Sequence, residues 1–181
     1  MTATAQWIER LIRSRELESL EPESVVPVPR LLPPAGREDI DQVQSRAGFR
    51  LPDDYREFLA ISNGMRNFYY TLSLLGCGDQ ADEDDLRAAL AVRRAYEESD
   101  MLRELGIVDD PAHLFPIAGG DGAASAIFLV DPVVQITPGP VLWLELSDVL
   151  VFRSFCDLLE REVDHGAYYE AGKEIPFLAG D

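Results

Sequence analysis

Three short apolar runs in the last third of the chain limit the folds open to it. They are "HLFPIAGG" (113–120), "SAIFLVDP" (125–132) and "GPVLWLEL" (139–146), and Gly, Asp and Pro separate them. Runs of this length and spacing indicate strands that follow one another in an antiparallel meander. Upstream, "FYYTLSLL" (68–75) is rich in aromatic and β-branched residues and predicts a further strand.

Helical patterns lie before and between these strands. Apolar residues recur among charges from Trp7 to Leu20, and a shorter pattern covers Asp39 to Ala47. The longest predicted helix covers residues 79–106, with acids at its start and a glycine stop, and a last helix covers residues 151–163. This order is not the regular alternation of a doubly wound sheet. It predicts an α+β fold with a central antiparallel sheet and helices packed on it.

The segment between the first two helices, "EPESVVPVPRLLPPAG" (21–36), contains five prolines. Proline lacks a backbone N–H and fixes φ, so a regular helix and a central strand are excluded here. The segment is too apolar for a free linker. We therefore expect an extended connection that lies on the domain.

The stretch "LPDDYREFLAISNG" (51–64) has the most internal order in the chain. Pro52 suits a first helical position, and Asp53 and Asp54 then face the positive end of the helix dipole. Gly64 fits a left-handed position just past the helix end. A narrow apolar face lies between them at helical spacing, formed by Tyr55, Phe58, Leu59 and Ser62. One well-made helix therefore explains the stretch without a catalytic or ligand-binding role.

Charge and composition exclude several classes of protein. The 181 residues carry 33 acidic and 16 basic side chains, and this net charge of −17 repels nucleic acid and anionic membranes. It would steer association with a basic protein, although solubility explains it equally well. The N-terminus fits no signal peptide, no run can cross a bilayer, and Cys77 and Cys156 form no metal or disulfide pattern. We expect a cytoplasmic protein without a cofactor or metal.

Three short motifs suggest chemistry, and each has a simpler explanation. "GCGDQA" (76–81) matches a dinucleotide-binding pattern, but several acids would surround the pyrophosphate. "GGDG" (119–122) lacks the lysine of a phosphate-binding loop and predicts a hairpin turn. A hydrolase built on Cys156 would need His113 or His165 nearby. The apolar neighbours of Cys156 instead favour a buried, inert thiol.

The order of these motifs resembles the SUKH superfamily, which includes fungal regulators of cell-wall synthesis and many bacterial immunity proteins. Its signature is a leucine-proline pair, an acid, an aromatic residue, a phenylalanine-leucine pair and an asparagine-glycine end. The matching positions are Leu51, Pro52, Asp53, Tyr55, Phe58, Leu59, Asn63 and Gly64. The segment "FPIAGGDGAASAIFLVDP" (115–132) is similar to a second block that ends in an aspartate, here Asp131.

The resemblance covers roughly residues 36–162, within one expected domain of residues 1–181. Residues 1–35 would add a helix and the proline-rich connection, and residues 163–181 a C-terminal extension. The family implies an α+β fold, no catalytic residues and binding to other proteins. It favours an immunity protein that neutralises a cognate toxin, for instance a nuclease. An intracellular regulatory scaffold and a hydrolase are the alternatives.

Charge and aromatic residues locate a candidate surface for a protein partner. Acids at the start of the longest predicted helix would attract a basic toxin domain. Tyrosine is enriched at binding hot spots, so a neighbouring pair of tyrosines supplies candidate anchors. The predicted partner-binding residues are Asp79, Asp82, Glu83, Asp84, Asp85, Tyr69 and Tyr70.

Overall fold

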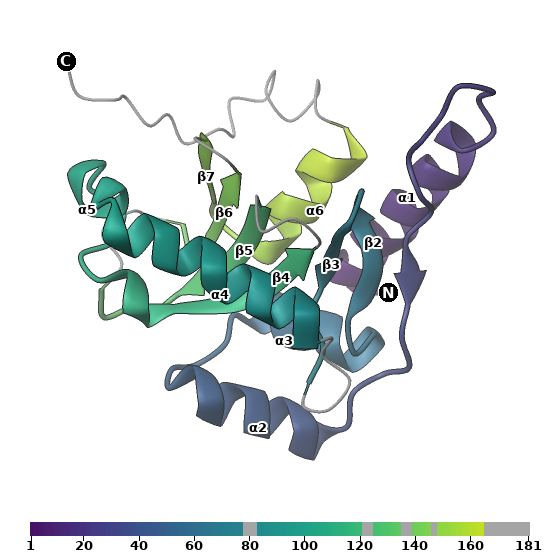
Figure 1. Cartoon of the computed structure of the whole chain (residues 1–181). Helices are drawn as coiled ribbons and strands as arrows, with labels where there is room; N and C mark the ends of the chain where they lie inside the picture. The colour runs from purple at the N-terminus through teal and green to yellow at the C-terminus, as the bar shows by residue number, and fades with distance from the viewer. Residues whose placement is uncertain (78–82, 121–124, 135–138, 146–147, 165–181) are drawn as a thin grey trace.

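The computed structural model describes residues 1–77, 83–120, 125–134, 139–145 and 148–164. Its strands form one seven-stranded sheet, in which each strand pairs antiparallel with the next one along the chain (Figure 1). This is the meander that the sequence predicts. The strands are β1 (Arg30–Leu31), β2 (Met65–Tyr69), β3 (Leu72–Leu74), β4 (Leu114–Gly120), β5 (Ser125–Val130), β6 (Val141–Glu145) and β7 (Asp148–Phe152).

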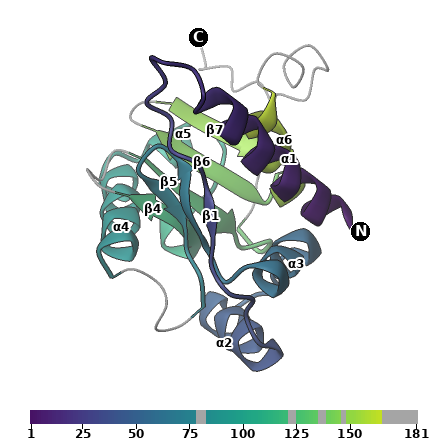
Figure 2. The same ribbon diagram turned by 90° about the vertical axis from the view of Figure 1, so that its right-hand side faces the viewer.

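Helices cover both faces of the sheet and give the molecule three layers. They are α1 (Ala3–Glu18), α2 (Arg37–Ala47), α3 (Asp53–Ile61), α4 (Glu83–Glu98), α5 (Met101–Glu104), the 3-10 helix η2 (Pro111–His113) and α6 (Phe155–Val163). On one face α4 packs against β4 and β5, and α5 and η2 contact α4. On the other face α1, α3 and α6 contact one another, and α2 packs against α3 (Figure 2). The predicted α+β fold is confirmed.

The sheet separates two apolar cores, because successive side chains of a strand point to opposite faces. In β6, Val141 and Trp143 belong to the core beneath α1, α3 and α6, whereas Leu142 and Leu144 belong to the core beneath α4. All four residues are buried. A strand that is covered on both faces needs no polar alternation, which explains the continuous apolar run of β6.

The predicted helix of residues 51–64 forms α3, which begins one residue after Pro52, with its two acids in the first turn. It ends at Ile61, earlier than predicted, because Ser62 is already extended. The rings of Tyr55 and Phe58 lie 5.3 and 5.1 Å from the ring of Phe155 in α6. The Asp54 carboxylate accepts a hydrogen bond of 2.9 Å from the backbone N–H of Cys156, in the first turn of α6. The motif therefore builds the contact between two helices.

The asparagine-glycine end of the same motif positions the chain where β2 begins. The side-chain oxygen of the buried Asn63 accepts a hydrogen bond from the backbone N–H of Cys77. Gly64 has a φ of +103°, and a Cβ atom there would lie 2.9 Å from the carbonyl oxygen of Leu74. Positive φ and close backbone packing both favour glycine. Leu51 and Leu59 are buried in the adjoining core.

One predicted strand is a hairpin. The sequence predicts a single strand over residues 68–75, but the structure divides them between β2 and β3. The chain turns at Tyr70 and Thr71, and Tyr70 has a φ of +48°, which interrupts a continuous pleat. The pairing of β2 with β3 also shifts register between Met65 and Tyr69, where Asn67 has a φ of +56°.

The longest predicted helix, over residues 79–106, is interrupted too. Residues 83–98 form α4 and residues 101–104 form α5, while residues 79–82 lie outside the described part of the chain. The break falls at Asp100, which has a φ of +54°. Ser and Asp side chains compete with the helix by bonding to nearby backbone groups. Here Ser99 Oγ accepts a hydrogen bond from the backbone N–H of Met101 at 3.5 Å.

The last predicted helix, over residues 151–163, begins later than expected. Val151 and Phe152 instead complete β7, where they pair with Leu142 and Val141 of β6. Ser154 then caps α6, because its hydroxyl accepts a hydrogen bond of 3.0 Å from the backbone N–H of Asp157.

Other predicted boundaries shift at the two ends of the sheet. Leu20, which the sequence places on the first helix, lies beyond α1 and is 78% exposed. The proline-rich segment contributes β1 at the sheet edge, in agreement with the exclusion of a central strand. Gly119 and Gly120 lie in β4 rather than in a turn, and residues 121–122 are not among those described. A Cβ atom on Gly119 would collide with the carbonyl oxygen of Asp85, so this glycine lets α4 approach the sheet.

Candidate partner-binding surface

The turn between β2 and β3 presents an exposed tyrosine on a strained backbone. Tyr70 is 45% exposed, and its φ of +48° lies in the left-handed region that bulky side chains rarely adopt. Strain of this kind costs on the order of 1–3 kcal/mol and concentrates at functional sites. Strain at an exposed aromatic residue makes this element a candidate for binding. We call Tyr69, Tyr70 and Thr71 the tyrosine turn.

Aromatic contacts hold the tyrosine turn on the sheet. The rings of Tyr69 and Tyr70 meet edge to face with centroids 4.8 Å apart, and Tyr69 meets Trp143 of β6 in the same way at 5.0 Å. Each such contact contributes about 0.5–1.5 kcal/mol beyond the burial of area. Trp143 is itself fully buried, and its indole N–H donates a hydrogen bond of 2.6 Å to Ser125 Oγ. The exposed ring of Tyr70 therefore packs on Tyr69, which in turn packs on the buried Trp143.

A buried ion network supports Trp143 from the helical side. The guanidinium of Arg161 lies 5.0 Å from the centroid of the Trp143 ring. Arg161 pairs with the buried Glu162 at 2.5 Å, and Glu162 also pairs with Arg15 of α1 at 3.1 Å. Removing one member of a buried ion pair is strongly destabilising. The network therefore fixes Trp143 relative to α1 and α6.

A hollow of about 390 Å³ lies beside the tyrosine turn, and we call it the glutamate hollow. Its lining residues are Tyr69, Tyr70, Thr71, Leu72, Gly120, Ser125 and Glu145. Ser125 and Glu145 are direct partners across β5 and β6. Because side chains alternate along a strand, Glu145 lies on the same face of β6 as Trp143. The hollow thus brings two phenol rings and a carboxylate together.

The surroundings of the Glu145 carboxyl group disfavour its ionised form. Burial raises its pKa above the usual range, Arg161 opposes the rise, and the carboxylates of Glu162 and Asp148 add to it. Within the described part of the chain, Glu145 forms no ion pair. Burial also raises the pKa of Tyr69, which keeps its phenol neutral. The ionised carboxylate of Glu145 is therefore less well stabilised here than it would be in water.

A second hollow, of about 460 Å³, adjoins the tyrosine turn, and we call it the acidic hollow. It is lined by Val25, Pro27, Asn67, Tyr70, Thr71, Ser73, Asp84 and Asp85. Asp84 is exposed and pairs with Arg87 at 2.7 Å in α4. The side chain of Asp85 is only 12% exposed and pairs with Arg66 of β2 at 2.9 Å, which ties α4 to the sheet.

The structure brings part of the predicted partner-binding set together. Tyr70, Asp84 and Asp85 line the acidic hollow, and Tyr69 lines the glutamate hollow. Asp79 and Asp82 lie outside the described residues, as does the side chain of Glu83 at the start of α4.

Sequence reasoning missed one residue of the surface, Glu145. The signal for it is its spacing, because Glu145 follows Trp143 by two residues at the end of an apolar strand. A period of two places both side chains on one face of the sheet.

The hydrolase alternative gains no support at Cys156. Its Sγ lies 3.5 Å from Thr4 Oγ1, and burial raises the pKa of the thiol. His113 lies near the carboxylates of Asp131 and Asp110, at 3.4 and 3.7 Å, in η2 beside α4. It is therefore on the opposite face of the sheet from α6. His165 is outside the described residues.

The described residues contain no arrangement typical of a metal site or of a membrane span. No group of three or more His, Cys, Asp or Glu side chains there is arranged to hold a metal ion. None of the helices in this part of the chain has the length and apolar character needed to cross a membrane.

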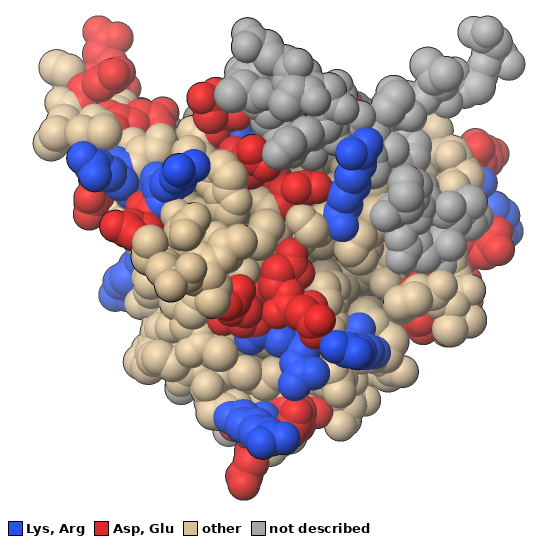
Figure 3. Space-filling view, turned by 180° about the vertical axis from the view of Figure 1, so that it is seen from behind, with Lys and Arg blue, Asp and Glu red and all other residues tan. Residues whose placement is uncertain are grey.

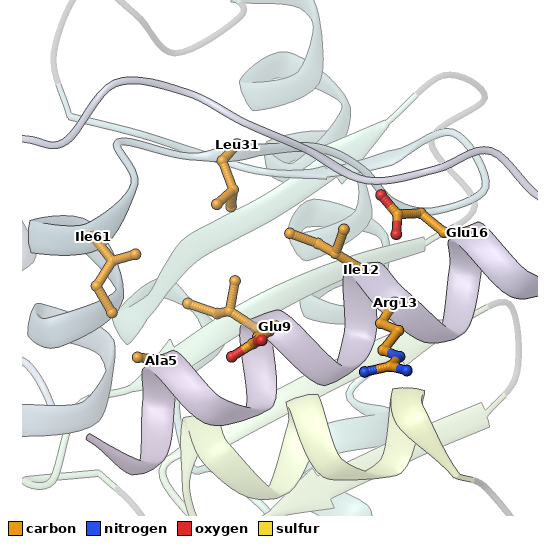
Figure 4. Close-up of a pocket in the computed structure, with 8 residues that line it drawn as sticks. Ala5, Glu9, Ile12, Arg13, Glu16, Leu31 and Ile61 are labelled. Carbon is orange, nitrogen blue, oxygen red and sulfur yellow. The ribbon is translucent and has the colours of Figure 1, made fainter. Parts of the chain in front are cut away.

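A third depression, the α1 groove, lies between α1, β1 and the end of α3 (Figure 4). Its volume is about 570 Å³. Apolar side chains of Ile8, Ile12, Leu31 and Ile61 line it together with Ala5, Glu9, Arg13 and Glu16. Ile8 belongs to the main core, whereas Leu31 is partly exposed.

Charge is mixed on the face opposite α4. Figure 3 shows acidic side chains gathered near the middle of this face, with arginine side chains next to them. Ion pairs of α2 and α3 have the same mixed character, with Arg50 2.9 Å from Asp53 and Arg56 3.9 Å from Asp41. Exposed pairs of this kind contribute at most about 1 kcal/mol each, but they offset local charge.

Fold and surface together define an α+β protein whose antiparallel meander carries an exposed aromatic turn between two hollows. The chain belongs to the SMI1 / KNR4 family (SUKH-1), whose family model matches residues 34–161. This match confirms the resemblance that the sequence motifs indicate. The comparison with curated proteins gives no match.

Proposed function

We propose that this protein is an immunity protein that binds a cognate bacterial toxin and neutralises it without catalysis. The tyrosine turn is the observation that carries the proposal. It combines an exposed ring and a strained backbone with packing on the buried ring of Trp143 through Tyr69. Aromatic residues held in this way are typical of binding hot spots. Membership in the SMI1 / KNR4 family supports a role in binding other proteins.

Charge favours a basic partner, such as the catalytic domain of a nuclease toxin. The chain has a net charge of −17, and acidic side chains line both hollows beside Tyr70. A nuclease must attract phosphate, so its surface is basic, and an acidic inhibitor would be steered towards it. In this proposal the protein acts in the cytoplasm as a single domain, without a cofactor, and binds neither nucleic acid nor membranes.

An intracellular regulatory scaffold, related to regulators of cell-wall synthesis, is the second candidate. The family match favours it, since the SUKH superfamily includes such regulators as well as immunity proteins. The same surface would then bind a signalling or assembly protein. The two candidates differ in whether the partner is toxic.

The deciding experiment is co-expression with the reading frame next to this gene. The neighbour alone should kill the cells, and the wild-type protein should restore survival. Tyr70→Asn should fail to restore it, whereas Val133→Asn, a control at an exposed apolar residue beyond the other end of β5, should succeed. A harmless neighbour, or toxicity that the wild-type protein does not relieve, would contradict immunity and favour the scaffold.

A further inference from the structure

The glutamate hollow has the walls of a site for an organic cation. The rings of Tyr69 and Tyr70, whose planes are 87° apart, both belong to residues that line it. The face of an aromatic ring attracts a cation, and the attraction strengthens when water is excluded. Glu145 contributes a carboxylate to the same hollow, and Ser125 lies directly across the strand pair from it.

The protein already contains one example of this chemistry at Trp143, whose ring contacts that of Tyr69. Arg161 lies over the ring of Trp143 and pairs with Glu162, so that one guanidinium contacts an aromatic face and a carboxylate. Tyr69 and Glu145 form the corresponding aromatic and acidic groups on the outer side of Trp143. Arg161 already interacts with Trp143 and Glu162. In the described part of the chain, the outer arrangement has a carboxylate without an ion pair.

We propose that the glutamate hollow binds the guanidinium group of an arginine side chain that the protein partner inserts beside Tyr70. This inference deepens the proposed function and rests on it for the nature of the partner. Guanidinium is planar, so it stacks on aromatic rings and donates two parallel hydrogen bonds to one carboxylate. Lysine offers only a compact point charge. A basic toxin domain would carry such arginines on its surface.

The test uses a short peptide, so it does not depend on the toxin. Acetyl-Gly-Arg-Gly-amide is titrated into the full-length ¹⁵N-labelled protein and followed by amide chemical shifts. The matched control is acetyl-Gly-citrulline-Gly-amide, which keeps the shape of arginine and removes its charge. The arginine peptide should produce saturating shifts at Tyr69, Tyr70, Gly120 and Glu145, with a dissociation constant on the order of millimolar. The citrulline peptide should not.

Two variants keep the inference open to refutation. Glu145→Gln preserves the shape of the hollow and should weaken binding about tenfold or more, because it removes a charge-assisted hydrogen bond. Tyr70→Asn should weaken binding too, while its remaining amide spectrum shows that the fold is intact. Equal binding of the arginine and citrulline peptides would overturn the inference, as would shifts centred elsewhere or binding that is unchanged in Glu145→Gln. Failure of the survival experiment alone would overturn immunity but leave the arginine site standing.

Discussion

The α1 groove differs in its construction from the two hollows beside the tyrosine turn. The groove is larger, at about 570 Å³ against about 390 and 460 Å³ for the two hollows. Among its apolar walls, Ile8 is a core residue, and Ile12 and Ile61 pack against the core. The tyrosine turn instead exposes an aromatic ring that the core does not need. We therefore choose the tyrosine turn over the larger groove as the candidate binding surface because of its wall chemistry and backbone strain.

Backbone geometry also closes the α1 groove to a partner strand. Arg30 and Leu32 face β2, and Leu32 donates a hydrogen bond to the carbonyl of Gly64, so the N–H of Leu31 points to the open edge. Pro29 and Pro33 lie two residues before and two residues after Leu31. Proline has no N–H to donate, and proline on an edge strand prevents pairing with another chain.

The largest effect should come from the groove, and it should be on stability. Ile8→Ala removes a side chain that is 3% exposed and should lower the free energy of unfolding by about 3 kcal/mol through lost burial and a cavity. Urea denaturation measures this loss. The protein that remains folded should bind its partner with unchanged affinity. A fall in affinity at full folding would make the groove part of the interface and break the comparison.

The tyrosine turn should show the reverse pattern. Tyr70→Asn should weaken partner binding by about 2 kcal/mol, or roughly 30-fold, as expected for a hot spot. Its stability should stay within about 1 kcal/mol of the wild type, because relief of the left-handed backbone offsets the lost contact with Tyr69. Calorimetric titration and thermal unfolding measure the two quantities. A stability loss above about 2 kcal/mol would identify Tyr70 as a structural residue.

The two aspartates of the acidic hollow should differ in how much they contribute to stability. Asp85→Asn should lower the free energy of unfolding by about 1 kcal/mol, because its pair with Arg66 is largely shielded from water. Asp84→Asn breaks an exposed pair with Arg87 and should change stability by less than about 0.5 kcal/mol. Denaturation of both variants in parallel provides the measurement. Equal losses would show that the ion pair of Asp85 does not hold α4 to the sheet.

Local sequence patterns predict the fold well where a segment forms a single helix or a single strand. The strands of residues 113–146 are recognisable because both faces are buried, and α3 because its start and its apolar face agree, although it ends at Ile61 rather than next to Gly64. The hairpin at Tyr70 is hidden, since its turn contains no glycine, proline, asparagine or aspartate to mark it. Val151 and Phe152 mislead because Phe152 is also spaced from Phe155 as in a helix. Pairing with β6 decides between the two, and a local pattern does not contain it.

For the candidate surface too, sequence predicts what depends on single residues and misses what depends on contacts between distant segments. Residue type and charge point to Tyr70 and to the acids of α4, because those properties belong to the residues themselves. Glu145 joins the surface only when the meander places the end of β6 beside the tyrosine turn, more than 70 residues earlier in the chain. A contact of that sequence separation leaves no local signal except the side-chain alternation along β6.

The smallest effect tests the glutamate hollow without any partner. Glu145→Gln should raise the free energy of unfolding at about pH 7 by about 0.5 kcal/mol or less. Burial raises the pKa of Glu145 in the folded protein, so folding disfavours its charged form, although Arg161 opposes this. Below about pH 4 the carboxyl is protonated in both states, so the gain should vanish there and appear as the pH rises through the folded pKa.

Denaturation of both proteins at about pH 4 and about pH 7 measures this difference. A variant less stable than the wild type at the higher pH would show that Glu145 serves the fold. A variant that is more stable yet binds the arginine peptide more weakly would show that Glu145 is retained at the expense of stability. A partner that supplies a positive charge to the hollow explains that combination, and Ile8 in the α1 groove should not show it.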